Sequence, residues 1–115
     1  LMLLHSISDK IVFNLLKNLK HGSLEIINLN GVKLTFGDFN NQLKAKIIIK
    51  TPALTYNLIK GGSIGFAECY MRGEFETPNL SNLIEIMARN IQIVYKFSGL
   101  LDLPLINFFK NCQTL

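Results

Sequence analysis

The sequence has 115 residues, which is enough for one domain and too few for both a cofactor-binding fold and a separate substrate domain. Hydrophobic residues make up 49% of the chain and charged residues only 17%, which excludes a disordered chain and predicts a filled core beneath a thinly charged surface. The net charge of +4 comes from lysines in the first half of the chain, without the arginines and stacking aromatics that read nucleic acid, so nucleic acid is not an expected partner.

The first predicted elements are a helix and a β-hairpin. Apolar residues recur at steps of three and four from Leu4 to Leu19, which predicts an amphipathic helix that ends before Gly22. A run of β-forming residues follows over 23–29, and Asn30-Gly31 suits the two positive φ angles of a type I′ turn. The alternation of apolar and polar residues over 32–36 completes the predicted hairpin.

A third strand is indicated by the alternation of apolar residues with lysines over 43–50. One face of this strand is expected to be buried, and the other face presents Lys44, Lys46 and Lys50. This lysine face suits an anionic membrane surface, but lysines that are merely solvated are the favoured interpretation.

Glycines divide the next segment into two predicted short helices. Thr51-Pro52 predicts a helix start, with Thr as the cap and Pro at the first helical position, and Gly61-Gly62 predicts the end of that helix. A second helix is expected to run to Met71 and to end at Gly73. Gly65 is expected to let this second helix approach its neighbour closely.

The last predicted elements are mostly helical. After a short strand over 74–77, the longest helix is expected to run from Asn79 to near Gly99, with Glu85 paired to Arg89, and residues 100–109 predict a turn and a short helix. The chain is therefore expected to form a single α+β domain over residues 1–115, in which several helices cover a small antiparallel sheet made of the hairpin plus further strands.

No catalytic or metal-ligating set is visible in the sequence. Cys69 and Cys112 lack the spacing of a metal site or a redox pair, which favours buried thiols in a reducing cytosol. The Gly61–Gly65 segment lacks the Lys and Ser or Thr of a phosphate-binding loop, so a turn between helices is the favoured interpretation. Glu68 and Arg72 are expected to pair along a helix, and no apolar run reaches the length of a membrane span.

Aromatic and sulfur-bearing side chains offer two interpretations. They could line a pocket for an acyl chain, which requires apolar volume more than specific groups, or they could be ordinary core, which apolar residues at helical spacing usually are. Ordinary core is the favoured interpretation. The residues concerned are Phe66, Tyr70, Met71, Phe97, Phe108 and Phe109.

One segment carries a family resemblance. The stretch from Gly61 to Glu74 reads GGSIGFAECYMRGE, with its central motif at Glu68-x-Tyr70-Met71-x-Gly73-Glu74. It resembles the N-terminal domain of cyclopropane-fatty-acyl-phospholipid synthases, whose pattern runs roughly G-x-x-G-L-A-E-A-Y-M-x-G-E. The Asn30-Gly31 turn and the strand that leads into Thr51-Pro52 are similar to that family's layout as well, and the likeness covers about residues 10 to 95.

The resemblance implies a sterol-carrier-like fold that precedes a methyltransferase domain, with S-adenosylmethionine as the cofactor of that second domain and none in this chain. It implies no catalytic residue here, because the family's catalytic positions lie beyond Leu115. The chain begins at Leu1 rather than Met and stops about where the link to the methyltransferase domain would begin, so a fragment, a split gene or an excised piece is expected. Gly61, Gly65, Glu68, Tyr70, Met71, Gly73 and Glu74 are implied as the domain's signature and docking element.

Two functions follow as expectations. The first is a non-catalytic module that docks to a methyltransferase domain and helps it reach phospholipid, in the cytoplasm or peripherally on the inner face of the membrane. Its lipid or partner contacts would include the phenylalanines Phe66, Phe97, Phe108 and Phe109 and the lysines Lys44, Lys46 and Lys50. The alternative is a free-standing, sterol-carrier-like protein that binds acyl lipids. A self-contained small enzyme is not expected.

Overall fold

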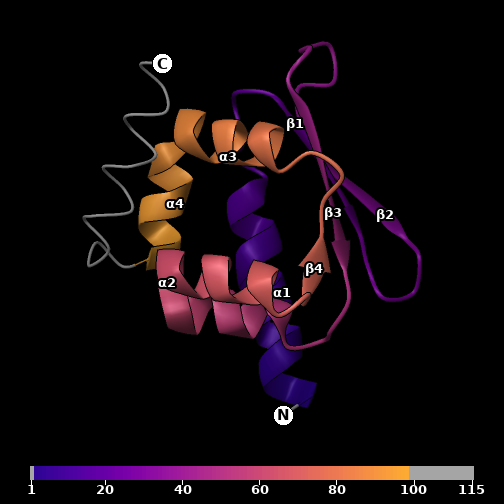
Figure 1. Ribbon diagram of the computed structural model, residues 1–115, viewed down its shortest axis with the longest axis vertical. Helices are drawn as coiled ribbons and strands as arrows, with labels where there is room; N and C mark the ends of the chain where they lie inside the picture. Colours follow the sequence, from indigo (N-terminus) through magenta and orange to yellow (C-terminus); the bar gives the residue numbers. More distant parts are fainter. Residues whose placement is uncertain (1, 99–115) are drawn as a thin grey trace.

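The computed structural model describes residues 2–98 of the chain. The predicted turn and helix over 100–109, which hold Phe108 and Phe109, lie outside the described residues, as does Cys112. The described part contains four helices and four strands (Figure 1). In chain order they are α1 (Met2–Leu16), β1 (Ser23–Ile27), β2 (Lys33–Gly37), β3 (Lys44–Ile49), α2 (Leu54–Met71), β4 (Phe75–Glu76), α3 (Leu80–Arg89) and α4 (Ile91–Ser98).

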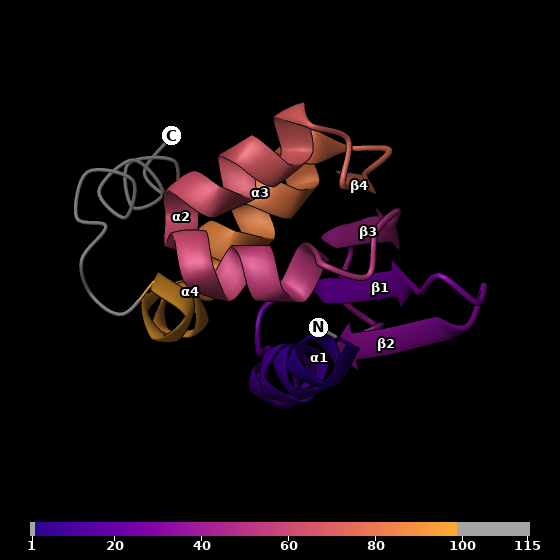
Figure 2. The ribbon, with the colours of Figure 1, turned by 90° about the horizontal axis from the view of Figure 1, so that it is seen from below.

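The strands form one sheet in the order β2-β1-β3-β4, and the helices lie together on one side of it (Figure 2). This arrangement confirms the α+β class. The sheet is mixed rather than wholly antiparallel: β1 pairs with β2 and β3 with β4 antiparallel, whereas β1 and β3 run parallel. The reason is the loop over residues 38–43, which carries the chain past the start of β1, so that β3 lies on the opposite side of β1 from β2.

The core lies between the helices and the inner face of the sheet. Leu24 and Ile26 on β1 point inward and are each 3% exposed, because alternate residues of a strand face opposite sides. They pack with Val12 of α1, Leu54 of α2 and Leu83 of α3 in a single buried cluster. Burial of such side chains is worth roughly 1.5–3 kcal/mol each, so this cluster is the main source of stability.

Helix α2 is broken where the sequence predicted a break. Gly61-Gly62 was expected to separate two helices, and Gly62, whose φ of 59° and ψ of −139° are not helical, divides the element from Leu54 to Met71 into two helical halves. The first half begins later than expected, however: Thr51 does not occupy the cap position, and its hydroxyl accepts a bond from the backbone N–H of Ala53, at 3.4 Å. The longest predicted helix, from Asn79 to near Gly99, is likewise wrong in its extent, because it divides at Asn90 into α3 and α4.

Candidate functional site

The segment that carries the family resemblance is the second half of α2 and the turn that follows it. Beyond the kink at Gly62, the helix folds back toward its own first half. A Cβ at Gly65 would stand 2.8 Å from the backbone oxygen of Asn57, closer than real Cβ contacts allow. The prediction that Gly65 permits a close approach is therefore confirmed. Nothing lies within 4 Å of a Cβ at Gly61, so this signature glycine has no comparable role.

Gly73 ends the helix in a left-handed conformation, with a φ of 72°. Its backbone N–H bonds the oxygen of Tyr70 at 3.1 Å, and that of Glu74 bonds the oxygen of Cys69 at 2.9 Å. These two bonds make a Schellman motif, in which glycine is favoured because it lacks a Cβ. The motif turns the chain sharply and returns the Glu74 side chain to the helix it has just left.

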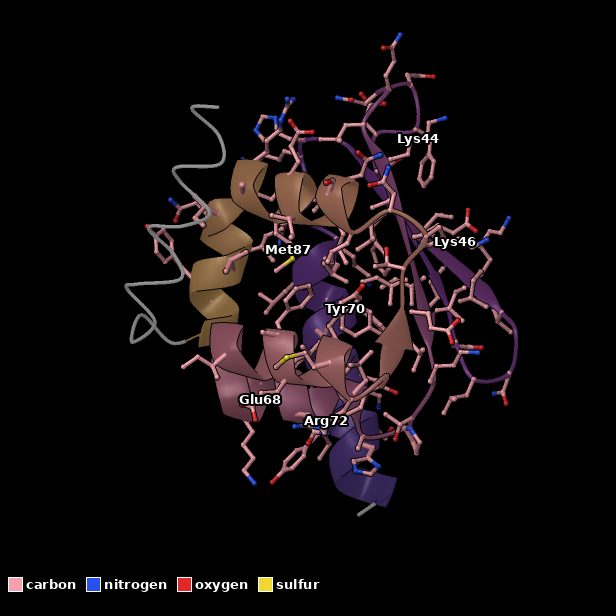
Figure 3. The ribbon with its side chains drawn as sticks, viewed as in Figure 1. Lys44, Lys46, Glu68, Tyr70, Arg72 and Met87 are labelled. Carbon is pink, nitrogen blue, oxygen red and sulfur yellow. The ribbon has the colours of Figure 1, made fainter. Side chains whose placement is uncertain are left out.

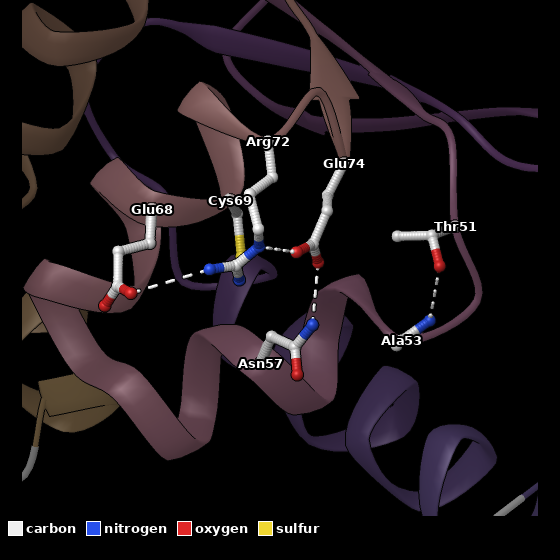
Figure 4. A network of polar contacts seen from close by, with 7 residues as sticks. All are labelled: Thr51, Ala53, Asn57, Glu68, Cys69, Arg72 and Glu74. Atoms are coloured by element: carbon white, nitrogen blue, oxygen red, sulfur yellow. Dashed lines mark hydrogen bonds and ion pairs between the residues drawn. The ribbon is translucent and has the colours of Figure 1, made fainter.

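Glu74 and Arg72 form the centre of a polar network (Figure 4). The Arg72 Nε–H donates to one carboxylate oxygen of Glu74 at 2.6 Å, and the Asn57 side-chain amide donates to the other at 2.7 Å. Arg72 also reaches Glu68 at 3.5 Å, which confirms the expected pair along the helix. The Glu74 side chain is only 14% exposed, so the network fastens both halves of α2 to the start of β4.

The network sets the protonation of two groups. Burial opposes ionisation of Glu74, but the bonds from Asn57 and Arg72 outweigh it and hold the pKa of this carboxyl below its ordinary value. Burial, followed by the negative charge of Glu74, raises the pKa of the Cys69 thiol to about 11. Cys69 is fully buried, as predicted, and a thiol that remains protonated at neutral pH is a poor nucleophile. The Cys69 thiol is therefore not an activated nucleophile within this network.

Apolar side chains on the same helix remain exposed. Ile64 and Met71 lie seven residues apart, on one helical face, and are 59% and 75% exposed. Tyr70 is 41% exposed, and its ring also packs against Phe75, with ring centroids 5.7 Å apart. Figure 3 shows Tyr70 and Met87 pointing into the space between α2 and α3. We call Ile64 and Met71 the α2 apolar face.

The three predicted lysines lie on or next to β3. Lys44 and Lys46 occupy alternate positions of the strand on its outer face, and Lys50 follows its end (Figure 3). Lys46 lies 3.6 Å from Glu25 and Lys50 lies 3.8 Å from Glu76, so two of the three charges are partly neutralised. Within residues 2–98, Lys44 has no ion pair.

An apolar cavity of about 110 Å³ lies between the helices and the sheet. Its wall comes from all four described helices and from β1 and β3, and it includes Phe66, which is half-buried. Phe66 also packs against Phe75, with ring centroids 5.3 Å apart. Phe97 lies in α4, but its side chain is outside what the structure describes.

A family model, described as a domain of unknown function (DUF7884), matches residues 11–96, which is most of the chain. The chain belongs to the DUF7884 family. No curated protein and no solved structure matches it.

The matched part of this DUF7884 domain includes the polar network, the α2 apolar face and most of the cavity wall. Among residues 2–98, no three His, Cys, Asp or Glu side chains gather as metal ligands. No helix within the same residues is both long and apolar enough to cross a bilayer.

Two residues of the site were missed by the sequence reasoning. Asn57 is a central donor of the network, and Asn90 joins the α3–α4 junction to the segment before β1. A helical pattern shows Asn57 only as a polar position, because its partner Glu74 is 17 residues away. For Asn90 the one available signal was the tendency of Asn to occur where helices end.

Proposed function

We propose that this domain is the non-catalytic N-terminal module of a cyclopropane-fatty-acyl-phospholipid synthase-like protein. It docks to a methyltransferase domain, in the same or a separate chain, and helps that domain reach phospholipid at the inner face of the membrane. S-adenosylmethionine would belong to the methyltransferase domain. A sterol-carrier-like fold is part of this proposal.

The observation that carries the proposal is the different placement of polar and apolar side chains within the Gly61–Glu74 segment. Its polar side chains Glu68, Arg72 and Glu74 bond one another, whereas its apolar side chains Ile64 and Met71 face outward. A rigid segment with uncovered apolar side chains suits a protein interface, since exposed apolar patches commonly mark one.

The docking part is tested by measuring association with a separately purified methyltransferase domain of a cyclopropane synthase. Ile64→Lys with Met71→Lys should weaken the association at least tenfold, because two charges would be placed in an apolar contact. Ile11→Lys is the matched control, since Ile11 is similarly exposed, at 47%, but lies on α1. Absence of association, or an equal loss in the control, would overturn the docking role.

The membrane part is tested with vesicles that contain anionic phospholipid. The outer face of the sheet carries Lys33, Lys44, Lys46 and Lys50 against Glu25 and Glu76, and this excess of positive charge favours binding at low salt. Lys44→Gln should lower vesicle binding more than Lys60→Gln, because Lys60 lies on α2 away from the sheet. If the wild-type domain fails to bind these vesicles at low salt, the membrane part is wrong.

The apolar cavity favours a second candidate function, an acyl-lipid binding protein. Pockets for whole ligands usually measure about 300–1,000 Å³, so a cavity of about 110 Å³ would hold only the end of an acyl chain. Displacement of a fluorescent acyl-chain probe with an uncharged head separates the candidates, since saturable one-to-one binding supports a carrier and its absence supports the docking module.

A further inference from the structure

A second pocket, which we call the polar chamber after Asp9, lies beside the apolar cavity. It measures about 290 Å³, opens to solvent, and lies between the first half of α1, the hairpin turn and the connection from β3 to α2. Most of its surface is apolar, and its polar lining residues include His5, Ser6, Asp9, Asn28, Thr51 and Thr55. None of these residues belongs to the polar network around Glu74.

The two chambers share a wall. Phe13, Ile49, Leu54 and Thr55 line both of them, so a single layer of side chains separates the apolar interior from the polar chamber. Phe13 is half-buried, and its ring stacks on Phe36 with centroids 6.1 Å apart. Either chamber alone is smaller than an ordinary ligand pocket, and the two together reach that size.

Thr55 and Asp9 lie at the boundary between the inner cavity and the polar chamber. Thr55 is 2% exposed, and its hydroxyl donates to Asp9 Oδ1 at 2.5 Å. This bond fixes the Asp9 side chain in place, and the carboxylate has no basic partner within residues 2–98. With histidine counted as neutral at pH 7, Asp9 is the one formally charged group among the described residues that line the polar chamber.

We propose that the two chambers form one site for a single-chain amphiphile with a cationic or uncharged polar head. The apolar end of the ligand enters the inner cavity, which accepts on the order of four methylene carbons, since an apolar cavity of about 150 Å³ holds benzene. The head lies in the polar chamber against Asp9, and the shared wall opens by movement of Phe13. An anionic head is disfavoured there, because it would place two like charges at close range.

This inference rests on the lipid-binding side of the proposed function and adds the chemistry of the head group. The probes are n-octylamine, n-octanol and octanoate, which share a chain length and differ in head charge. Calorimetric titration of the full chain at pH 7 should show saturable one-to-one binding of octylamine and octanol, with octanoate at least tenfold weaker. Equal affinity for all three, or tightest binding of octanoate, would overturn the role of Asp9.

Two variants locate the site. Asp9→Asn should weaken octylamine binding about tenfold and change octanol binding by less than threefold. The control Asp38→Asn, which alters an exposed carboxylate in the loop over 38–43, should leave the binding of both ligands unchanged. Leu58→Phe fills part of the inner cavity and should weaken all ligands that bind there. If Leu58→Phe does not fold, amide chemical shifts of the wild-type chain still test the site, because octylamine should perturb Phe13 and Leu54.

The results are independent of the docking proposal. Failure of all three probes to bind saturably would remove this site and leave the association of the α2 apolar face with a methyltransferase domain untouched. Failure of that association, with octylamine bound as expected, would remove the docking role and leave the amphiphile site.

Discussion

The Asn90 side chain makes three bonds to backbone groups that lie 69 or 70 residues away in the chain. Its side-chain oxygen accepts the backbone N–H groups of Lys20 at 2.9 Å and His21 at 3.1 Å. Its side-chain amide donates to the backbone oxygens of His21 and Ile86, each at 2.8 Å. Asn90 is 8% exposed, so it satisfies backbone groups in a place where water has little access.

Asn90→Ala should therefore lower the free energy of unfolding by about 2–4 kcal/mol, because it leaves several backbone groups without partners. Urea denaturation followed by circular dichroism measures the change. Asn40→Ala is the control, since Asn40 is exposed and only its backbone N–H is bonded. A loss below about 1 kcal/mol in Asn90→Ala would show that water replaces the lost bonds.

Glu74 should give the protein an acid-sensitive contribution to stability. Its folded pKa is lowered by the bonds from Asn57 and Arg72, so the contribution is complete above the unfolded pKa of about 4.3 and is lost as the pH falls through the folded pKa. Glu74→Gln should lower the free energy of unfolding by about 1–2 kcal/mol at pH 7 and have a smaller effect near pH 3.

Denaturation of Glu74→Gln at several pH values measures this difference. Glu76→Gln is the matched control, because the Glu76 side chain is 62% exposed and reaches Lys50 only at 3.8 Å. A destabilisation of Glu74→Gln that is equal at pH 3 and pH 7 would contradict the role of the charged form.

The sequence predicted side-chain contacts at the residue scale only where the partners are close in the chain. The pairs Glu85–Arg89 and Glu68–Arg72 follow from helical spacing, and the structure confirms both, at 3.0 and 3.5 Å. The bonds of Asn90 span 69 and 70 residues, and no local pattern encodes such a separation.

At the scale of elements, the glycines of α2 were a correct signal. Gly61-Gly62 was predicted to end a helix, and Gly62 is not helical and separates the two halves of α2. Gly65 then lets the second half pack against the first half at Asn57. The sequence pattern places the break, and the direction in which the chain continues is set by that tertiary contact.

The two signature glycines on either side of the kink should respond oppositely to alanine. Gly65→Ala should destabilise the domain by about 1–3 kcal/mol, because its Cβ would collide with the Asn57 backbone. Gly61→Ala should be neutral or stabilise by up to about 1 kcal/mol, since its site is open and alanine favours the helix. Thermal unfolding of both variants tests the pair, and equal melting temperatures would contradict the close approach.

At the scale of the whole molecule, the class of fold was predictable and the direction of its strands was not. The alternation over 43–50 indicated a strand with an inner and an outer face, and the structure has Ala45 and Ile49 buried and Lys44 exposed. The side of β1 on which that strand lies depends on the path of the loop over 38–43, which hydrophobic patterning does not specify.

The candidate site, too, was predictable within one element and not across elements. The resemblance identified the Gly61–Glu74 segment, and periodicity placed most of it on a helix. The polar chamber was not foreseen, because Asp9 and Thr55 belong to different helices and are 46 residues apart in the chain. A site built across elements becomes visible only when the helices are packed.

The parallel pairing of β1 and β3 also constrains the order in which the domain can fold. β1 and β2 are joined by a tight turn, so their pairing closes a short loop and is fast, whereas β3 can complete the centre of the sheet only after the chain has travelled past β1. Until β3 arrives, one edge of the hairpin stays open to other chains. We therefore expect a nascent chain of this domain to be exposed to aggregation in the interval between these two events.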